Sequence, residues 1–92
     1  MDVKAAVNLA KKHIADLFGQ EGAANIGLEE VEYDEARGQW HITVGFTRIW
    51  DRGGILAQFA DARVVGRTYK IVTLDKEGKP LSVKNREPAD AG

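Results

Sequence analysis

Three carboxylates stand at alternate positions in one stretch of the chain, at Glu30, Glu32 and Asp34. In a β-strand, alternate residues share a face and lie about 7 Å apart. Two carboxyl groups near that distance can act as the acid and base of glycoside hydrolysis. No apolar residue shares their face to raise a carboxyl pKa. We therefore favour a solvated acidic face, matched by Arg and Lys residues on the next strand.

Other catalytic groups are sparse. The chain has no cysteine, and its one serine, Ser82, has no histidine beside it in sequence. The two histidines, His13 and His41, are far apart, and no acidic cluster has the spacing of a calcium loop. The pair Gly53-Gly54 lacks the following Lys and Ser or Thr of a phosphate-binding loop. The sequence therefore predicts no enzyme activity, metal or cofactor.

Residues 49–62 form a connection longer than a hairpin needs, and they carry unusual apolar surface for a loop. In one interpretation, residues 55–60 form a short helix that closes one end of the core. In the other, the segment binds a protein partner or a second copy of the chain in a homodimer, with Gly53-Gly54 as a hinge, because aromatic and Arg side chains dominate interface energies. The residues predicted to contact the partner are Trp50, Arg52, Ile55, Leu56 and Phe59.

Basic residues border the same segment and suggest weak nucleic-acid binding as an alternative. They are Arg48, Arg52, Arg63, Arg67 and Lys70. The formal net charge of −1 argues against this interpretation, as do two acidic residues within the segment, Asp51 and Asp61. A third interpretation is a small-ligand-binding domain or a minor enzyme with a pocket between helix and sheet.

The composition is that of one small domain. The chain has 92 residues, of which 43% are hydrophobic and 29% charged. Residues 1–35 hold eight acidic and three basic side chains, a net of −5, whereas residues 36–92 hold six and ten, a net of +4. No apolar run approaches 18 residues, and the first seven residues lack the pattern of a signal peptide. We therefore expect a cytoplasmic protein with no membrane segment, unless the chain was excised from a longer exported protein.

The helical part of the chain is predicted at residues 3–18, where apolar residues recur every three or four positions. Asp2 is placed to cap its start, and Gly19 or Gly22 can end it. His13 falls at the edge of the apolar stripe, as a boundary residue rather than a ligand.

Four strands are predicted to follow, at residues 26–33, 40–46, 67–74 and 81–84. The second alternates Trp40, Ile42, Val44 and Phe46 with polar or small residues, as a central strand does. The first breaks its alternation near Glu29 and Glu30, which predicts a bulge. Residues 34–38 and 75–80 form turns that open with Asp and close with Gly. The predicted fold is α+β: an N-terminal helix packed on a four-stranded antiparallel meander, with residues 1–85 as the domain and residues 86–92 as a flexible tail.

The stretch from Tyr69 to Val83 contains a Tyr-bearing strand, an Asp-x-x-Gly turn and a short aliphatic strand. This order resembles the small PepSY-type domains, and one helix cradled by an antiparallel sheet is similar to cystatin-like folds. The resemblance implies a non-catalytic module that binds or restrains another protein, sometimes a peptidase. The segment 49–62 departs from that pattern. Together, these observations predict a non-enzymatic protein-interaction module.

Overall fold

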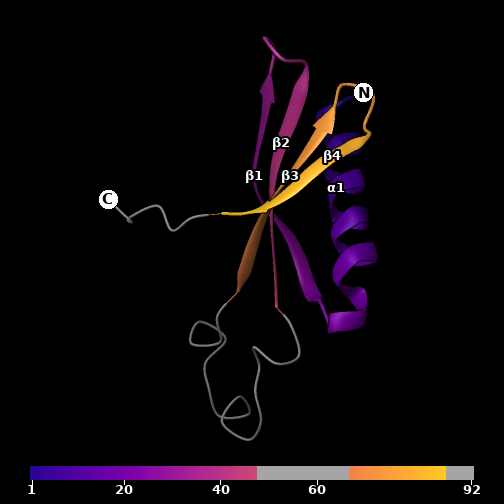
Figure 1. Ribbon diagram of the computed structural model, residues 1–92, viewed down its shortest axis with the longest axis vertical. Helices are drawn as coiled ribbons and strands as arrows, with labels where there is room; N and C mark the ends of the chain where they lie inside the picture. The colour runs from indigo at the N-terminus through magenta and orange to yellow at the C-terminus, as the bar shows by residue number, and fades with distance from the viewer. Residues whose placement is uncertain (48–66, 87–92) are drawn as a thin grey trace, which may run out of the picture.

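One helix lies against one face of a four-stranded antiparallel sheet in the computed structural model, which describes residues 1–47 and 67–86 (Figure 1). The elements, in chain order, are α1 (Val3–Phe18), the 3-10 turn η1 (Gly19–Glu21), β1 (Ala24–Asp34), β2 (Gln39–Thr47), β3 (Thr68–Asp75) and β4 (Pro80–Asn85). The strands lie in the order β1-β2-β3-β4. This confirms the predicted α+β meander, with strand ends shifted by one or two residues.

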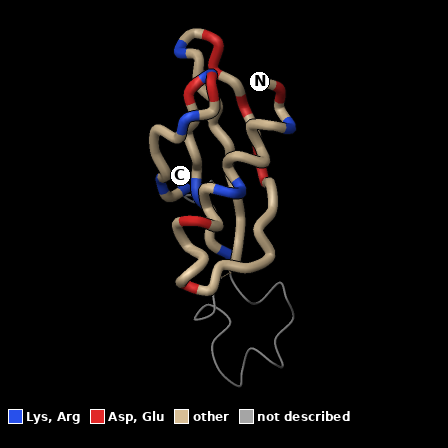
Figure 2. The backbone as a smooth tube through the Cα atoms, turned by 90° about the vertical axis from the view of Figure 1, so that its right-hand side faces the viewer, with Lys and Arg blue, Asp and Glu red and all other residues tan. Residues whose placement is uncertain are grey.

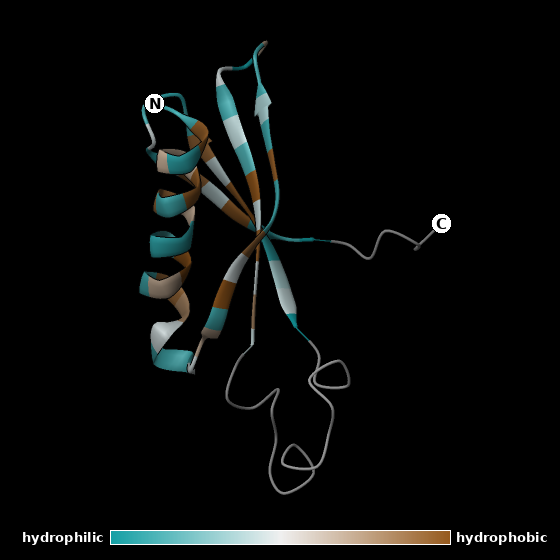
Figure 3. Ribbon diagram, turned by 180° about the vertical axis from the view of Figure 1, so that it is seen from behind, coloured by the Kyte–Doolittle hydropathy of each residue, from teal (hydrophilic) through white to brown (hydrophobic). Residues whose placement is uncertain are grey.

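Helix α1 begins where the sequence predicts. The Asp2 carboxylate accepts a hydrogen bond of 2.8 Å from the backbone N–H of Ala5, and such a cap satisfies a donor with no partner inside the helix. The buried residues are Ala6, Val7, Ala10 and Ile14. Figure 3 shows the hydrophobic side of α1 facing the strands. Val3 and Leu17, at the two ends of the predicted stripe, are 50% and 48% exposed and contribute little to the core.

The C-terminal end of α1 uses the two predicted glycines in different ways. The helix gives way to η1 at Gly19, which stays right-handed with φ of −58°. Gly22 takes the left-handed conformation, with φ of 79°, and closes η1. A residue with a side chain adopts such a φ only at a cost, so Gly22 is where the chain turns toward β1.

The hydrophobic core lies between α1 and the sheet. Small side chains of α1 at Ala6 and Ala10 are fully buried against it. The strand residues of the core are Trp40, Ile42, Val44, Phe46, Val72 and Leu74. Phe18 extends this core, with its ring centroid 5.2 Å from that of Phe46. At the other end, the rings of Tyr33 and Trp40 lie 4.8 Å apart.

Strand β1 contains the predicted bulge. Leu28 pairs with Val44 and Glu30 pairs with Thr43, so Glu29 is the extra residue. A second irregularity lies between Ala24 and Gly27. The bulges keep the apolar residues of β1 on the α1 side despite the broken alternation, as a one-residue insertion must.

The two turns also have the predicted chemistry. The turn between β1 and β2 starts at Asp34 and ends with Gly38, which has φ of 63°. The turn between β3 and β4 starts at Asp75 and contains Gly78, with φ of 95°. Beyond β4, the backbone N–H of Arg86 donates to the Tyr69 carbonyl at 3.2 Å, while residues 87–92 of the predicted tail lie outside the described ranges. Within those ranges, no helix is long and apolar enough to cross a membrane.

Candidate interaction surface

The residues predicted to contact a partner all lie in the span that the structure does not describe. Trp50, Arg52, Ile55, Leu56 and Phe59 fall between residues 48 and 66. The two interpretations of that segment therefore both stay predictions. Among the described residues, a second broad surface is the side of the sheet that faces away from α1, which we call the outer face.

Two transverse rows of side chains cross the outer face. The first row, from β1 to β4, contains Glu30, Thr43, Ile71 and Lys84. The second row contains Glu32, His41, Thr73 and Ser82. Neighbours within such a row lie about 5 Å apart and can contact each other. The rows are thus acidic on β1, mixed polar and apolar on β2 and β3, and basic at Lys84 on β4.

The middle of the outer face is more buried than a water-facing strand predicts. Thr43 is 3% exposed and Thr47 is 7% exposed. Glu30, Glu32 and Lys84, on the edge strands, are exposed. The threonines of β2 are therefore buried although they lie on the face away from α1, because a central strand is flanked by the side chains of both neighbours.

A pair of glycines forms a floor in the outer face, and Arg67 lies over it. Gly27 and Gly45 are register partners on β1 and β2. The Arg67 guanidinium passes over them and donates a hydrogen bond of 2.8 Å from Nη2 to the Asn25 carbonyl. A Cβ added at Gly45 would lie 3.0 Å from the Tyr69 ring and 3.1 Å from Arg67 Nη2. The glycines therefore allow Arg67 to link the start of β3 to β1.

This linkage continues through a small polar network. The Asn25 amide donates to Thr47 Oγ1 at 3.2 Å, and Thr47 Oγ1 donates to the Ala24 carbonyl at 3.2 Å. Asn25 has φ of 56°, an unusual backbone conformation that Asn tolerates better than most residues. The network fixes the first irregularity of β1 and explains why Thr47 is buried without being apolar.

The acidic row of β1 has the predicted arrangement but not the predicted partners. Glu30, Glu32 and Asp34 share the outer face. Opposite them on β2 stand Thr43, His41 and Gln39, rather than Arg or Lys. Asp34 pairs instead within its own turn, with its Oδ2 4.0 Å from Arg37 Nε. The prediction of cross-strand charge matching is therefore wrong here, because the register places polar residues opposite the acids.

The groups that could carry acid–base or metal chemistry are not assembled into a site. His41 Nδ1 lies 3.4 Å from Thr73 Oγ1, a contact between neighbouring strands. His13 is half-buried on α1, as the sequence predicts for a boundary residue. Within residues 1–47 and 67–86, no group of three His, Cys, Asp or Glu side chains could hold a metal ion.

Two of the basic residues considered for nucleic-acid binding are described, and they lie on opposite faces. Arg67 extends over the outer face. Lys70 lies on the α1 side, with Nζ 5.4 Å from the centroid of the Phe18 ring and bonded to Asn85 Oδ1. Arg67 and Lys70 therefore do not form one basic surface.

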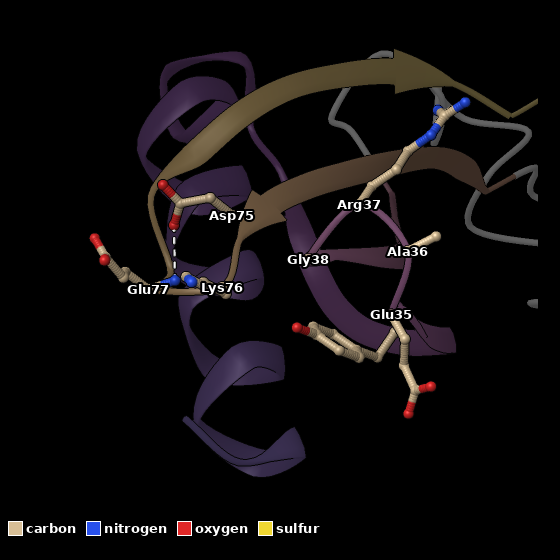
Figure 4. A pocket seen from close by; sticks show the side chains of 8 residues that line it. Glu35, Ala36, Arg37, Gly38, Asp75, Lys76 and Glu77 are labelled. Atoms are coloured by element: carbon tan, nitrogen blue, oxygen red, sulfur yellow. Dashed lines mark hydrogen bonds between the residues drawn. The ribbon is translucent and has the colours of Figure 1, made fainter.

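An open cleft of about 500 Å³ lies between the two turns. Its lining consists of Tyr33, Glu35, Ala36, Arg37, Gly38, Asp75, Lys76 and Glu77. Charged residues of both signs gather at this end of the molecule (Figure 2). The side chains of Glu35, Arg37 and Glu77 point in different directions rather than toward a common centre (Figure 4). The cleft thus has polar walls but no convergent set of groups.

One carboxylate of this cleft is held by backbone donors. Asp75 Oδ1 accepts hydrogen bonds from the N–H groups of Lys79, at 2.9 Å, and Glu77, at 2.8 Å. These bonds, that from Lys79 first, lower the pKa of Asp75 below its ordinary value. The Asp75 carboxylate therefore stabilises the turn between β3 and β4.

Both edges of the sheet carry features that hinder the addition of another strand. Edge strand β1 has two irregularities and the exposed acids Glu29 and Glu30. Edge strand β4 begins with Pro80, has a register shift against its partner β3, and carries the exposed Lys84. Proline, charge and bulges are the usual protection of sheet edges. Both edges are therefore poorly suited to pairing with a further strand.

Sequence reasoning missed the role of Arg67 and its glycine floor. A glycine inside a strand often marks a close approach by another group, so Gly27 and Gly45 were the available signal. Comparisons of the chain with models of protein families, with curated proteins and with solved structures found no match. The resemblance to PepSY-type and cystatin-like domains stays a prediction.

Proposed function

We propose that this chain is a non-enzymatic protein-binding module that contacts its partner through the outer face. The observation that supports this proposal best is that the faces and edges of the sheet differ in how they are covered or protected. Helix α1 packs on one face, and both edges carry features that disfavour strand addition. The outer face carries exposed side chains on three strands, among them Glu30, Tyr69 and Lys84.

The chemistry of the outer face favours a protein over a small molecule. Its exposed groups are spread over a surface about four strands wide, or roughly 15 Å between the outer strands. Small ligands are generally bound in concave, largely apolar pockets. A protein surface can instead engage Tyr69 together with the acidic and basic ends of the rows, as mixed interfaces do.

A photo-activated cross-linker placed at Tyr69 tests this proposal in cells that make the protein. We expect protein adducts from the variant at Tyr69, which is 36% exposed on the outer face. The matched control carries the same cross-linker at Asn8, an exposed residue of α1. Recovery of no protein adduct from Tyr69, or equal recovery of the same proteins from both positions, would refute binding by the outer face.

Small-ligand binding is the second candidate, and the cleft between the turns favours it. The core residues between α1 and the sheet, such as Ile14 and Ile42, are fully buried. The cleft of about 500 Å³ has the size of a small-ligand site. A thermal-shift screen tests it, because a ligand at 100 times its dissociation constant adds about 2.7 kcal/mol to the free energy of unfolding.

A further inference from the structure

The first row of the outer face has opposite charges at its two ends. Glu30 stands on β1 and Lys84 on β4, with Thr43 and Ile71 between them. Three strand spacings separate the two charged residues, about 14 Å between their Cα atoms. Neither side chain makes an ion pair or hydrogen bond with another residue of the described ranges. Both charges are exposed.

This arrangement is self-complementary under one particular symmetry. A two-fold axis that runs along the strands, between β2 and β3, places β1 of one copy opposite β4 of the other. Within the first row, this axis sets Glu30 opposite the partner's Lys84 and Lys84 opposite the partner's Glu30. The two contacts are ion pairs. Thr43, which is 3% exposed, and the half-buried Ile71 lie between the two ion pairs and add little contact surface. An interface between identical copies about a two-fold axis needs this property, that residue i meets residue j and j meets i.

The second row fits the same symmetry. The axis sets Glu32 opposite the partner's Ser82, so that the serine O–H can donate to the carboxylate. The axis also sets His41 opposite the partner's Thr73. The same two residues already lie in contact within one copy, with 3.4 Å between His41 Nδ1 and Thr73 Oγ1. A two-fold axis perpendicular to the strands would instead set β1 against β1 and bring the acidic residues together. The charges thus favour one of the two face-to-face arrangements.

We propose that the outer face binds a second copy of this chain, about a two-fold axis parallel to the strands. This inference rests on the proposed protein-binding function and names the partner. The formal net charge of −1 does not oppose self-association. A face of about 20 Å by 20 Å lies at the small end of specific interfaces, so we expect dissociation in the micromolar range.

Charge reversal at the two ends of the row tests the geometry, with molar mass followed by sedimentation against concentration. Glu30→Lys or Lys84→Glu alone places like charges opposite each other twice, and each should weaken the dimer by about tenfold or more. An equal mixture of the two variants restores both ion pairs in a heterodimer, one between the two substituted positions and one between the two unchanged residues. The double variant restores both pairs in a homodimer, with each charge reversed.

The matched control is Glu29→Lys, which makes the same charge change one residue away, at the exposed bulge outside the row. It should dimerise like the wild type. All variants are first checked for an unchanged circular dichroism spectrum and melting temperature. A wild type that stays monomeric to about 0.5 mM overturns the inference. So does a mixture that associates no better than its components, or a Glu29→Lys variant as weak as Glu30→Lys.

The failure of this inference is distinct from failure of the proposed function. A monomeric wild type that still gives adducts with another protein from Tyr69 keeps protein binding and removes the second copy. Absence of any protein adduct from Tyr69 removes both. Cross-links from Tyr69 to the same chain, lost in Glu30→Lys and regained in the double variant, would support both.

Discussion

The two hairpin turns have the same chemistry, but they lie in different surroundings. Each opens with an Asp that accepts backbone hydrogen bonds, and each contains a glycine with positive φ. The turn between β1 and β2 projects from the end of the sheet, whereas the turn between β3 and β4 lies beside the start of α1 (Figure 1).

The difference is clearest at the two glycines. A Cβ built at Gly38 has its nearest neighbours at 3.9 Å, so the position has room for a side chain. A Cβ at Gly78 lies 2.7 Å from Leu9 Cδ1 and 3.2 Å from Met1 Sδ. Gly38 is therefore needed for its backbone conformation alone, whereas Gly78 also serves the packing of a turn against the helix. The same Asp-to-Gly pattern in the two turns therefore contributes unequally to the stability of the fold.

The largest effect is expected for Gly78→Ala. Its φ of 95° is strained for alanine, and the new methyl group must also displace the ends of Leu9 and Met1. Strain and repacking together should lower the free energy of unfolding by about 2–3 kcal/mol. Denaturant melts measure this loss. Combining the change with Leu9→Ala tests the cause, because the loss in the double variant should be smaller than the sum of the two single losses if Leu9 contributes to the clash.

Gly38→Ala should cost less, about 1–2 kcal/mol, because only the positive φ is unfavourable there. The same denaturant melts give the comparison directly. Gly38→Asn is the matched control and should recover most of the loss, since Asn tolerates the left-handed conformation. Equal losses at Gly38 and Gly78 would show that contact with α1 adds nothing to the second turn.

Asp34→Ala should lower the free energy of unfolding by about 0.5–1 kcal/mol. It removes the hydrogen bond of 3.1 Å that Asp34 Oδ1 accepts from the Arg37 N–H. The accompanying ion pair, at 4.0 Å and on the surface, should add almost nothing. Arg37→Gln is the control, and it should leave stability unchanged. A loss for Arg37→Gln as large as that for Asp34→Ala would assign the effect to the ion pair.

The smallest effect should appear in acid, at the turn between β3 and β4. The pKa of Asp75 is lowered in the folded protein, chiefly by the Lys79 N–H. Ionised Asp75 therefore stabilises the fold above its unfolded pKa of about 3.9, and this contribution is lost as the pH falls through the lower folded pKa. Asp75→Asn keeps an acceptor but cannot titrate. Its melting temperature should depend less on pH below about 4 than that of the wild type. An unchanged pH dependence would contradict this assignment.

Much of this fold could be predicted from the sequence because its signals are local. The cap at Asp2, the bulge at Glu29 and the two Asp-to-Gly turns each follow from the residue types within a few positions. The pairing within β1–β2 and within β3–β4 followed as well, since a short turn brings its two strands together, whereas no short turn dictates the pairing of β2 with β3. Leu17, which is half-exposed, shows the limit of the helical pattern. The periodicity predicts which side of the helix is apolar, but it does not predict where along the helix the contact with the sheet ends.

The candidate surface was harder to predict, since it depends on register between strands. The alternation places Glu30 and Glu32 on one face, but only the pairing shows that Thr43 and His41 stand opposite them. The relation between Glu30 and Lys84 requires three successive registers, and a slip of one residue in any of them would move a side chain to the other face. Arg67 reaches Asn25 across 42 positions of sequence, and the strand glycines signal a close approach there without identifying Arg67 as the residue that makes it.

The meander order of the strands also shapes how the chain can fold. In β1–β2 and in β3–β4, the paired residues are close in sequence, so each hairpin can form with little loss of chain entropy. Pairing β2 with β3 must instead close the 20 residues between Thr47 and Thr68, and the entropic cost of such closure grows with the length of the connection. Joining the two hairpins is therefore expected to be the slow step of folding, and the Arg67 bond to Asn25 becomes possible only after it.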